Sequence, residues 1–211
     1  MQSTEFIGFD GQRYLGPDLP LALGSHCVIK IDPNTVLLAG GATSPYSTTS
    51  KTYFFDIPSE TWTEGPAMNK RRKQHSCVIL EDINYVFVLG GRGDDSFSEL
   101  ASVEVLSLKS FPNQLSWIEP ENLMLPKPLA SFGSISLTKF QTFNRLYVFG
   151  GINPGITEYS EDICELICTD YEIQDCSWQI LDQKLSLPRG GMLSCPLAHT
   201  SRLYHLQELN K

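Results

Sequence analysis

An apolar run that ends in two glycines occurs three times along the chain. The segments are NTVLLAGG, NYVFVLGG and NRLYVFGG, which end at Gly41, Gly91 and Gly151. Each begins with asparagine, and successive glycine pairs lie 50 and then 60 residues apart. Each pair is followed by a tryptophan, at Trp62, Trp117 and Trp178. This self-similarity indicates one structural unit that is repeated.

Within a unit, every segment predicts a β-strand. HCVIKI and HSCVIL, rich in β-branched residues, precede the first two glycine pairs, and Cys27 and Cys77 each lie 13 residues ahead of the pair. After the pair, a polar loop leads to TYFFDI, ASVEVLSL or DICELICTD, and then to a short strand with the tryptophan. We expect a longer connection between the first two strands of the third unit, Thr138 to Asn144. No helical periodicity is present, and four strands in about 50 residues is the size of one β-propeller blade.

This combination of motifs resembles the kelch repeat family. The glycine pair after the second strand, an apolar or aromatic position in the third and the tryptophan in the fourth are the family's pattern, and the match covers residues 22 to about 185. A tyrosine that the family often shows in the third strand has a fair match only at Tyr53. The resemblance implies an all-β fold, a kelch-type β-propeller.

We expect one kelch-repeat domain over residues 1–211, with terminal segments that are parts of blades. QRYLGPDLP, near the N-terminus, is similar to TWTEGPAM, so the chain is expected to start inside a blade. Because exposed sheet edges favour pairing, the two ends would join. Two arrangements stay open: about four blades, one of them a composite of both termini, or an open fragment of a larger propeller. The expected blades are 21–68, 69–125 and 126–186, with partial blades 1–20 (third and fourth strands) and 187–211 (first and second strands).

The glycine pairs and tryptophans are expected to be structural. Glycine tolerates positive φ and lets blades approach closely, whereas a phosphate-binding loop would need a helix after the glycines. Each tryptophan is expected to pack between blades with one N–H to satisfy. The pair Gly190-Gly191 precedes its strand and is not explained in this way. The structural glycines are Gly40, Gly41, Gly90, Gly91, Gly150 and Gly151.

Composition excludes several classes of partner. The formal net charge is −8 and the sequence pI is about 5.0, so no extended basic surface for nucleic acid is expected. No apolar run approaches the roughly 20 residues that cross a bilayer, and the N-terminus lacks the features of a signal peptide. The sequence predicts a cytoplasmic protein, with a nuclear location also open, and a secreted one if the chain is a fragment.

No catalytic or metal-binding set is apparent in the sequence. His26 and His75 occupy nearly equivalent places in two units, as a repeat predicts without any metal. A copper radical oxidase of the galactose-oxidase type needs a Cys, two Tyr and two His around the metal, and the repeat positions do not provide them. A disulfide between Cys168 and Cys176 across a hairpin is geometrically feasible in an oxidising compartment, whereas buried free thiols are expected inside a cell. We expect no cofactor.

The sequence therefore predicts a non-catalytic protein-interaction module, such as a substrate adaptor or a cytoskeletal or signalling scaffold. In kelch proteins the loops at one propeller face hold protein or peptide partners, and loops carry function on a fixed scaffold. A ring of arginines would hold an acidic peptide, with aromatic side chains beside it, unless these arginines only solvate the loops. The alternatives are a propeller enzyme of the galactose-oxidase or epimerase type and a fragment of an extracellular kelch-containing receptor. The residues expected at the partner site are Arg71, Arg72, Arg92, Arg189, Tyr46, Phe97 and Tyr159.

Overall fold

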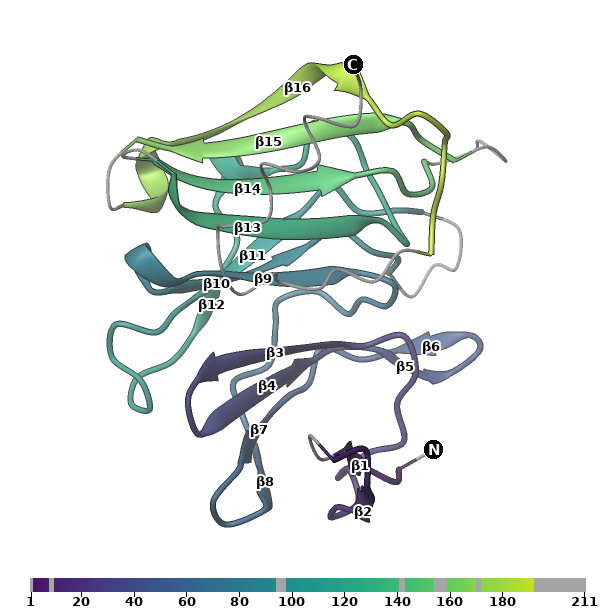
Figure 1. Cartoon of the computed structure of the whole chain (residues 1–211), viewed down its shortest axis with the longest axis vertical. Helices are drawn as coiled ribbons and strands as arrows, with labels where there is room; N and C mark the ends of the chain where they lie inside the picture. Colours follow the sequence, from purple (N-terminus) through teal and green to yellow (C-terminus); the bar gives the residue numbers. More distant parts are fainter. Residues whose placement is uncertain are drawn as a thin grey trace.

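The computed structural model describes residues 2–7, 10–93, 98–140, 143–153, 159–169 and 172–191. Within these residues the fold is all-β: three four-stranded antiparallel sheets follow one another along the chain, with two small hairpins (Figure 1). No α-helix is present in this part, and no helix there is long and apolar enough to span a membrane. Three short 3-10 turns interrupt the strands, η1 (Glu81–Ile83), η2 (Glu121–Leu123) and η3 (Ile173–Asp175).

The first sheet and the two hairpins are formed by residues up to 64. The sheet has the order β3-β4-β7-β8, and the β5–β6 hairpin extends from the loop between β4 and β7. The strands predicted near the N-terminus are also present, as the hairpin β1–β2. The bounds are β1 (Glu5–Ile7), β2 (Arg13–Leu15), β3 (Cys27–Asp32), β4 (Thr35–Ala39), β5 (Ala42–Ser44), β6 (Ser47–Thr48), β7 (Thr52–Asp56) and β8 (Thr61–Glu64).

The second and third sheets have the same topology, β9-β10-β11-β12 and β13-β14-β15-β16. The longer connection expected over Thr138 to Asn144 is wrong, because β13 continues to Phe140 and β14 begins at Phe143, so the added residues lengthen the hairpin itself. The bounds are β9 (Ser76–Leu80), β10 (Tyr85–Leu89), β11 (Val103–Ser107), β12 (Trp117–Ile118), β13 (Gly133–Phe140), β14 (Phe143–Phe149), β15 (Asp162–Cys168) and β16 (Cys176–Lys184).

Successive sheets pack face to face through apolar clusters. Because side chains alternate along a strand, each sheet presents one apolar row to the sheet before it and another to the sheet after it. The core between the second and third sheets includes side chains with no exposed surface, each contributing roughly 1.5–3 kcal/mol on burial. Examples from these cores are Leu37, Ala39, Val88 and Leu106 between the first two sheets, and Phe87, Val105, Leu146 and Leu166 between the second and third.

Crossovers, the segments that lead into the first strand of each sheet, are joined to one another by backbone hydrogen bonds. Gln74 N–H donates to the carbonyl of Ser25 at 2.9 Å, Ser131 N–H to Gln74 at 2.9 Å, and Gly191 N–H to Ser131 at 2.7 Å. All four residues have positive φ, between 53° and 68°. We call this series the crossover ladder. Gly191 has the positive φ that this position of the ladder adopts, a conformation that glycine takes without strain.

The glycine pairs have the conformation that the sequence predicts. Gly90 and Gly91 have φ of 53° and 93°. A Cβ on Gly90 would lie 2.6 Å from the carbonyl oxygen of Leu129 in the next crossover, and the N–H of Gly91 donates to that oxygen at 2.8 Å. The positive φ and the close approach of the Leu129 oxygen both favour glycine, since a side chain at position 90 would push the crossover away from the strand end. The other two pairs also have positive φ.

Two of the three tryptophans, Trp117 and Trp178, connect neighbouring sheets. The indole N–H of Trp117 donates to the carbonyl of Pro66 at 2.9 Å, and that of Trp178 to the carbonyl of Leu123 at 2.9 Å, so each bonds to the chain leaving the preceding sheet. Trp62 packs near the N-terminal hairpin, and its buried N–H has no partner among the described residues. The first interface, between the β1–β2 hairpin and the first sheet, therefore lacks, in this part of the chain, the tryptophan hydrogen bond that the two interfaces between successive sheets have.

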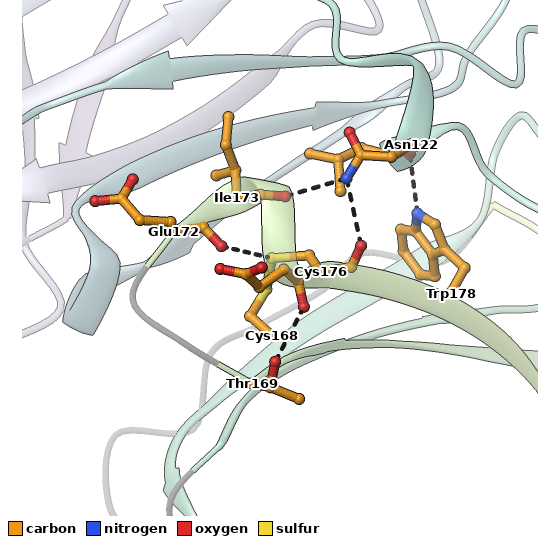
Figure 2. The surroundings of a disulfide bond; sticks show 9 residues. Asn122, Cys168, Thr169, Glu172, Ile173, Cys176 and Trp178 are labelled. Atoms are coloured by element: carbon orange, nitrogen blue, oxygen red, sulfur yellow. Dashed lines mark hydrogen bonds between the residues drawn. A yellow bond between two sulfur atoms is a disulfide. The ribbon is translucent and has the colours of Figure 1, made fainter.

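Two disulfides cross-link the described residues. Cys168 and Cys176 are directly opposed on β15 and β16, with Cα atoms 4.0 Å apart, and are bonded to each other. The sequence left open whether these two cysteines are paired, as in an oxidising compartment, or are free thiols, as inside a cell, and the structure contains the disulfide. Figure 2 shows that Asn122 lies beside this bridge and donates to the carbonyls of Ile173 at 3.2 Å and Cys176 at 3.4 Å. The amide thus ties the outer edge of the second sheet to that of the third.

The second disulfide, Cys27–Cys77, joins the first strands of the first and second sheets across 5.8 Å between Cα atoms. The two cysteines are equally far from their glycine pairs along the sequence. In the paired strands, however, they occupy different register positions. Cys27 is paired with Ala39, the residue just before its glycine pair, whereas Cys77 is paired with Val88, one position earlier. Because side chains alternate, this offset turns the two thiols toward each other.

Candidate functional site

The loop face is the edge of the sheets where the second strands end. There, each loop after a glycine pair forms a backbone bridge with the neighbouring crossover: Gly24 with Ala42, Lys73 with Arg92, and Ala130 with Ile152. We define the loop face by the exposed or partly exposed side chains of Tyr46, Arg71, Arg92 and Tyr159. These loops are fixed at both ends by regular strands, so their side chains have a rigid base.

Tyr46 is the most exposed aromatic side chain of this face, at 82%. It lies at the tip of the β5–β6 hairpin, which projects from the first sheet in Figure 1. The ammonium of Lys73, in the crossover to the second sheet, donates to the carbonyl of Pro45 at 2.9 Å. This bond connects the loop of Tyr46 to the crossover that carries the exposed Arg71.

Arg72 does not belong to this surface, so its assignment to a partner site is wrong. Its side chain is fully buried and donates to the carboxylate of Glu104 at 2.7 Å, to the carbonyl of Gly90 at 2.7 Å and to the carbonyl of Ser102 at 3.1 Å. Burial lowers the pKa of the Arg72 guanidinium, and the charge of Glu104 counteracts this shift. The backbone N–H of Asn69 also donates to Glu104, so the ion pair fixes the whole crossover.

Arg92 is engaged by its own loop. Its Nε and Nη2 both donate to Oε1 of Glu99, at 3.0 and 2.7 Å. The glutamate side chain is only 3% exposed, whereas that of Arg92 is 26% exposed. A partner can therefore contact the edge of the guanidinium, while most of its charge is balanced within the protein. Phe97 lies outside the described residues.

Tyr159 and Arg189 lie together at the far end of the loop face. The Tyr159 ring is half-exposed and lies on Gly190, where an added Cβ would be 2.5 Å from a ring carbon. Arg189 is exposed and donates a long bond, 3.4 Å, to the carbonyl of Leu187. The structure thus brings Tyr46 near the crossover of Arg71, and Tyr159 near Arg189, rather than forming one ring of arginines.

No metal-binding or nucleophilic group is apparent in the described residues. No group of three or more His, Cys, Asp or Glu side chains among them is placed to hold a metal. Cys164 is buried, and desolvation raises the pKa of its thiol to about 11, with the charge of Asp162 adding to the shift. Asp162 itself is neutralised by Lys127 and Lys184. The thiol of Cys164 therefore stays protonated at neutral pH and is a poor nucleophile.

His75 is also a core residue. Its ring is buried against Gly40, and Nε2 lies 3.0 Å from the carbonyl oxygen of Ala39. Burial, together with the charge of Arg72, lowers the pKa of His75 to about 3. Burial also lowers the pKa of His26, its counterpart in the first unit. Both imidazoles are neutral at pH 7, so neither adds a cation to the loop face.

The neutral His75 makes stability depend on pH. The unfolded chain binds a proton at this site below about pH 6.5, whereas the folded protein does not bind it until about pH 3, so unfolding is favoured as the pH falls. Between pH 7 and pH 5 we expect the wild type to lose about 2 kcal/mol more than the variant His75→Phe. Urea unfolding at the two pH values measures this difference. Phenylalanine is a suitable replacement because Phe132 occupies the same place in the third unit. Equal pH dependence in both proteins would contradict the burial of a neutral imidazole.

Comparison with known proteins identifies the fold but not the family. No protein-family model and no curated protein sequence matches the chain. Among solved structures, the fold is similar to that of YjhT, with a TM-score of 0.65 and 13% sequence identity. The match covers 87% of this chain and 58% of the YjhT chain, so this chain spans less than two thirds of the length of that protein. At this identity the likeness concerns the fold alone.

Two residues of the loop face were missed from the sequence, Lys73 and Glu99. Lys73 ends the basic run KRRK, and Glu99 lies in an acidic, polar segment, so neither residue stands out in the sequence. Both act on the shape of the loops, Lys73 by bonding to the hairpin of Tyr46 and Glu99 by holding Arg92. The only available signal was the single glutamate seven residues after Arg92, across the loop.

Proposed function

We propose that the three sheets are blades of a kelch-type β-propeller and that the protein is a non-catalytic interaction module. The kelch-like spacing of glycine pairs and tryptophans supports the assignment, together with the face-to-face packing of three sheets of equal topology. The pairing of loops and crossovers at one edge is what a module with a fixed binding face requires. The strands expected over residues 188–210 lie outside the described residues from 192 onward.

The loop face binds a protein segment with acidic side chains. The observation that carries this proposal is the exposure of two tyrosines on a rigid edge: Tyr46, at 82%, near the crossover of the exposed Arg71, and Tyr159, at 50%, near the exposed Arg189. Tyrosine and arginine supply much of the binding energy at protein interfaces because they give large contact areas and directed hydrogen bonds. A carboxylate of the partner would accept charge-assisted bonds from Arg71 and from the free edge of Arg92.

Binding of a fluorescent oligo-glutamate peptide that also carries tyrosines tests this function. We expect measurable binding by fluorescence anisotropy, weaker at high salt because the contact is partly ionic. The variant Tyr46→Ala/Arg71→Glu is expected to bind about tenfold less tightly, the loss of about 1.4 kcal/mol. The matched control is Arg13→Glu, a charge reversal at an exposed arginine of the β1–β2 hairpin. Equal binding of an oligo-lysine peptide, or unchanged binding by the double variant, would count against the loop face.

A second candidate, a fragment of an extracellular kelch-containing receptor, is favoured by the two disulfides. Disulfides persist in oxidising compartments and are rare in the cytosol. If the protein is made in such a compartment, alkylation of the denatured, unreduced chain followed by peptide mapping is expected to label Cys164 and none of the four paired cysteines. Labelling of Cys27 and Cys77 in protein isolated from its native location would instead favour an intracellular scaffold.

A further inference from the structure

Arg189 has the backbone environment of Arg72. The carbonyl of Arg72 accepts the N–H of Gly41, and the carbonyl of Arg189 accepts the N–H of Gly151, each at 2.8 Å. Two residues later, both segments join the crossover ladder. The segment of Arg189 is therefore built as a crossover that leads into a further sheet, although the described residues end at 191.

The side chain at the crossover position of Arg72 packs into the sheet that the crossover leads to. There it meets a residue on the third strand of that sheet, at the same position in each unit. That site is the residue paired with the position two before the glycine pair. Where the crossover residue is apolar, it belongs to the same core cluster as the residue on the third strand. Where the crossover residue is an arginine, the residue on the third strand is a glutamate that pairs with it. The three combinations are Leu23 with Tyr53, Arg72 with Glu104, and Leu129 with Cys164.

The β1–β2 hairpin offers a fourth such site, at Glu5. The N–H of Gly16 donates to the carbonyl of Thr4 at 2.8 Å, as the N–H of Gly65 donates to that of Thr52 at 2.9 Å in the first sheet. The residue after Thr4 therefore takes the place that the buried glutamate has in the second sheet. Glu5 is an acid at this site, and Arg189 is the cation at the crossover that has no following sheet in the described residues.

Both groups are open to a partner in the structure. Arg189 is exposed, and the Glu5 carboxylate is 51% exposed and, within the part of the chain that the structure describes, pairs with the exposed Arg13 at 3.7 Å. By contrast, the side chains of Arg72 and Glu104 have no exposed surface. An exposed ion pair such as Glu5–Arg13 stabilises a protein little, so it does not compete strongly with a buried one.

The space in front of the first sheet is also open. Val28 on β3 is 52% exposed, whereas the residues in the same register on the other first strands, Cys77 and Ser134, are 8% and 1% exposed. A cavity of about 390 Å³ lies here, lined by Phe6 of the hairpin and Trp62 of the sheet among others. The hairpin thus covers the outer part of this face and leaves the inner part free.

The two open ends lie far apart within one chain. In Figure 1 the β1–β2 hairpin lies beyond the first sheet at one end of the stack, and the third sheet lies at the other end. We propose that two copies of this chain associate head to tail, with Arg189 of each copy paired to Glu5 of the other in the way Arg72 is paired to Glu104. The contact is heterologous, because it joins two different surfaces of the chain. Two copies that make this contact at both ends form a closed ring. They bring together six four-stranded sheets and two β1–β2 hairpins, eight blade positions, within the range of about four to eight blades in propellers.

Mixing two charge-reversed variants tests the proposal. We expect the wild type to be a dimer by light scattering after size exclusion, and Arg189→Glu and Glu5→Arg each to be monomers, since each homodimer would place like charges together. An equimolar mixture of the two variants is expected to restore the dimer. The glutamate introduced in one chain then meets the arginine introduced in the other at one contact, and the native pair is kept at the second. Circular dichroism checks that both variants are folded.

Three outcomes would overturn the proposal: a monomeric wild type, variants with the mass of the wild type, or a mixture that stays monomeric. If the mixture stays monomeric while the double variant Arg189→Glu/Glu5→Arg regains wild-type stability as a monomer, the chain's own hairpin is the partner of Arg189. Arg13→Glu is the control, since it removes only the exposed pair with Glu5. The inference rests on the proposed propeller arrangement but not on peptide binding, which is measured separately, so either can fail without the other.

Discussion

Replacing Arg72 with leucine is expected to lower the free energy of unfolding by about 3–5 kcal/mol. The carboxylate of Glu104, which has no exposed surface, would then lie in the core without its cation. The carbonyl of Gly90 would lose Arg72 as a donor as well, whereas the carbonyl of Ser102 would keep the N–H of Gly90. Urea unfolding monitored by tryptophan fluorescence measures the change. Arg13→Leu is the control, because the side chain of Arg13 is 74% exposed and its ion pair with Glu5 is exposed as well, and a change within about 0.5 kcal/mol is expected there.

A second substitution tests whether the buried charge causes the loss. The variant Arg72→Leu/Glu104→Tyr copies the pair Leu23–Tyr53 of the first sheet into the second. Replacing both members of a buried ion pair by apolar residues is often nearly neutral, so we expect at least half of the lost stability to return. The return is incomplete because the N–H groups of Asn69 and Lys70 lose their acceptor on Glu104. Strictly additive effects in this double-mutant cycle would show that the two side chains are not coupled.

Trp117→Ala is expected to cost about 3–5 kcal/mol, as is usual when a large buried side chain is removed from a core. The ring is 5% exposed and belongs to the cluster between the first and second sheets, and its N–H bonds to the carbonyl of Pro66. Both the packing and the hydrogen bond that join these sheets would be lost. Chemical denaturation followed by far-UV circular dichroism measures the change without relying on the removed fluorophore.

Trp62→Ala is the control for the position within the repeat. Trp62 is only partly buried, and its N–H has no partner among the described residues, so its removal is expected to cost clearly less than that of Trp117. Trp117→Phe, which keeps most of the packing and removes the hydrogen bond, is expected to lie between the wild type and Trp117→Ala. Equal losses for Trp62→Ala and Trp117→Ala would mean that the first interface is as complete as the second.

The strands could be predicted from the sequence because their signals are local. The apolar runs, the glycine pairs and the tryptophans each depend on a few neighbouring residues, and these predict strands of the four-stranded sheets to within a few residues. The strands β5 and β6 lie where a polar loop was expected. Contacts between distant segments have no such signal. Arg72 was grouped with three basic neighbours in KRRK, although its acceptor is 32 residues away on β11. A lone glutamate in the apolar segment VEVLS was the one indication that a buried cation was needed.

The disulfide between the first two sheets was missed for a different reason. Counting from the glycine pairs makes Cys27 and Cys77 equivalent, and equivalent residues on neighbouring blades face the same way. The hairpin between β3 and β4 contains a register shift between Lys30 and Asp32, so counting along the chain does not give the pairing. A shift of one residue reverses the face on which a side chain lies, and only the paired strands show it.

The crossover ladder has a consequence for how such a chain can change over generations. Each rung is the same bond between two backbone groups, from Ser25 to Gln74, from Gln74 to Ser131 and from Ser131 to Gly191, and so does not depend on which side chains a unit carries. Duplication or loss of one whole unit in the gene would leave every remaining rung intact, while an insertion of a few residues within a crossover would break one. The number of units can therefore vary among descendants more easily than the length of a crossover.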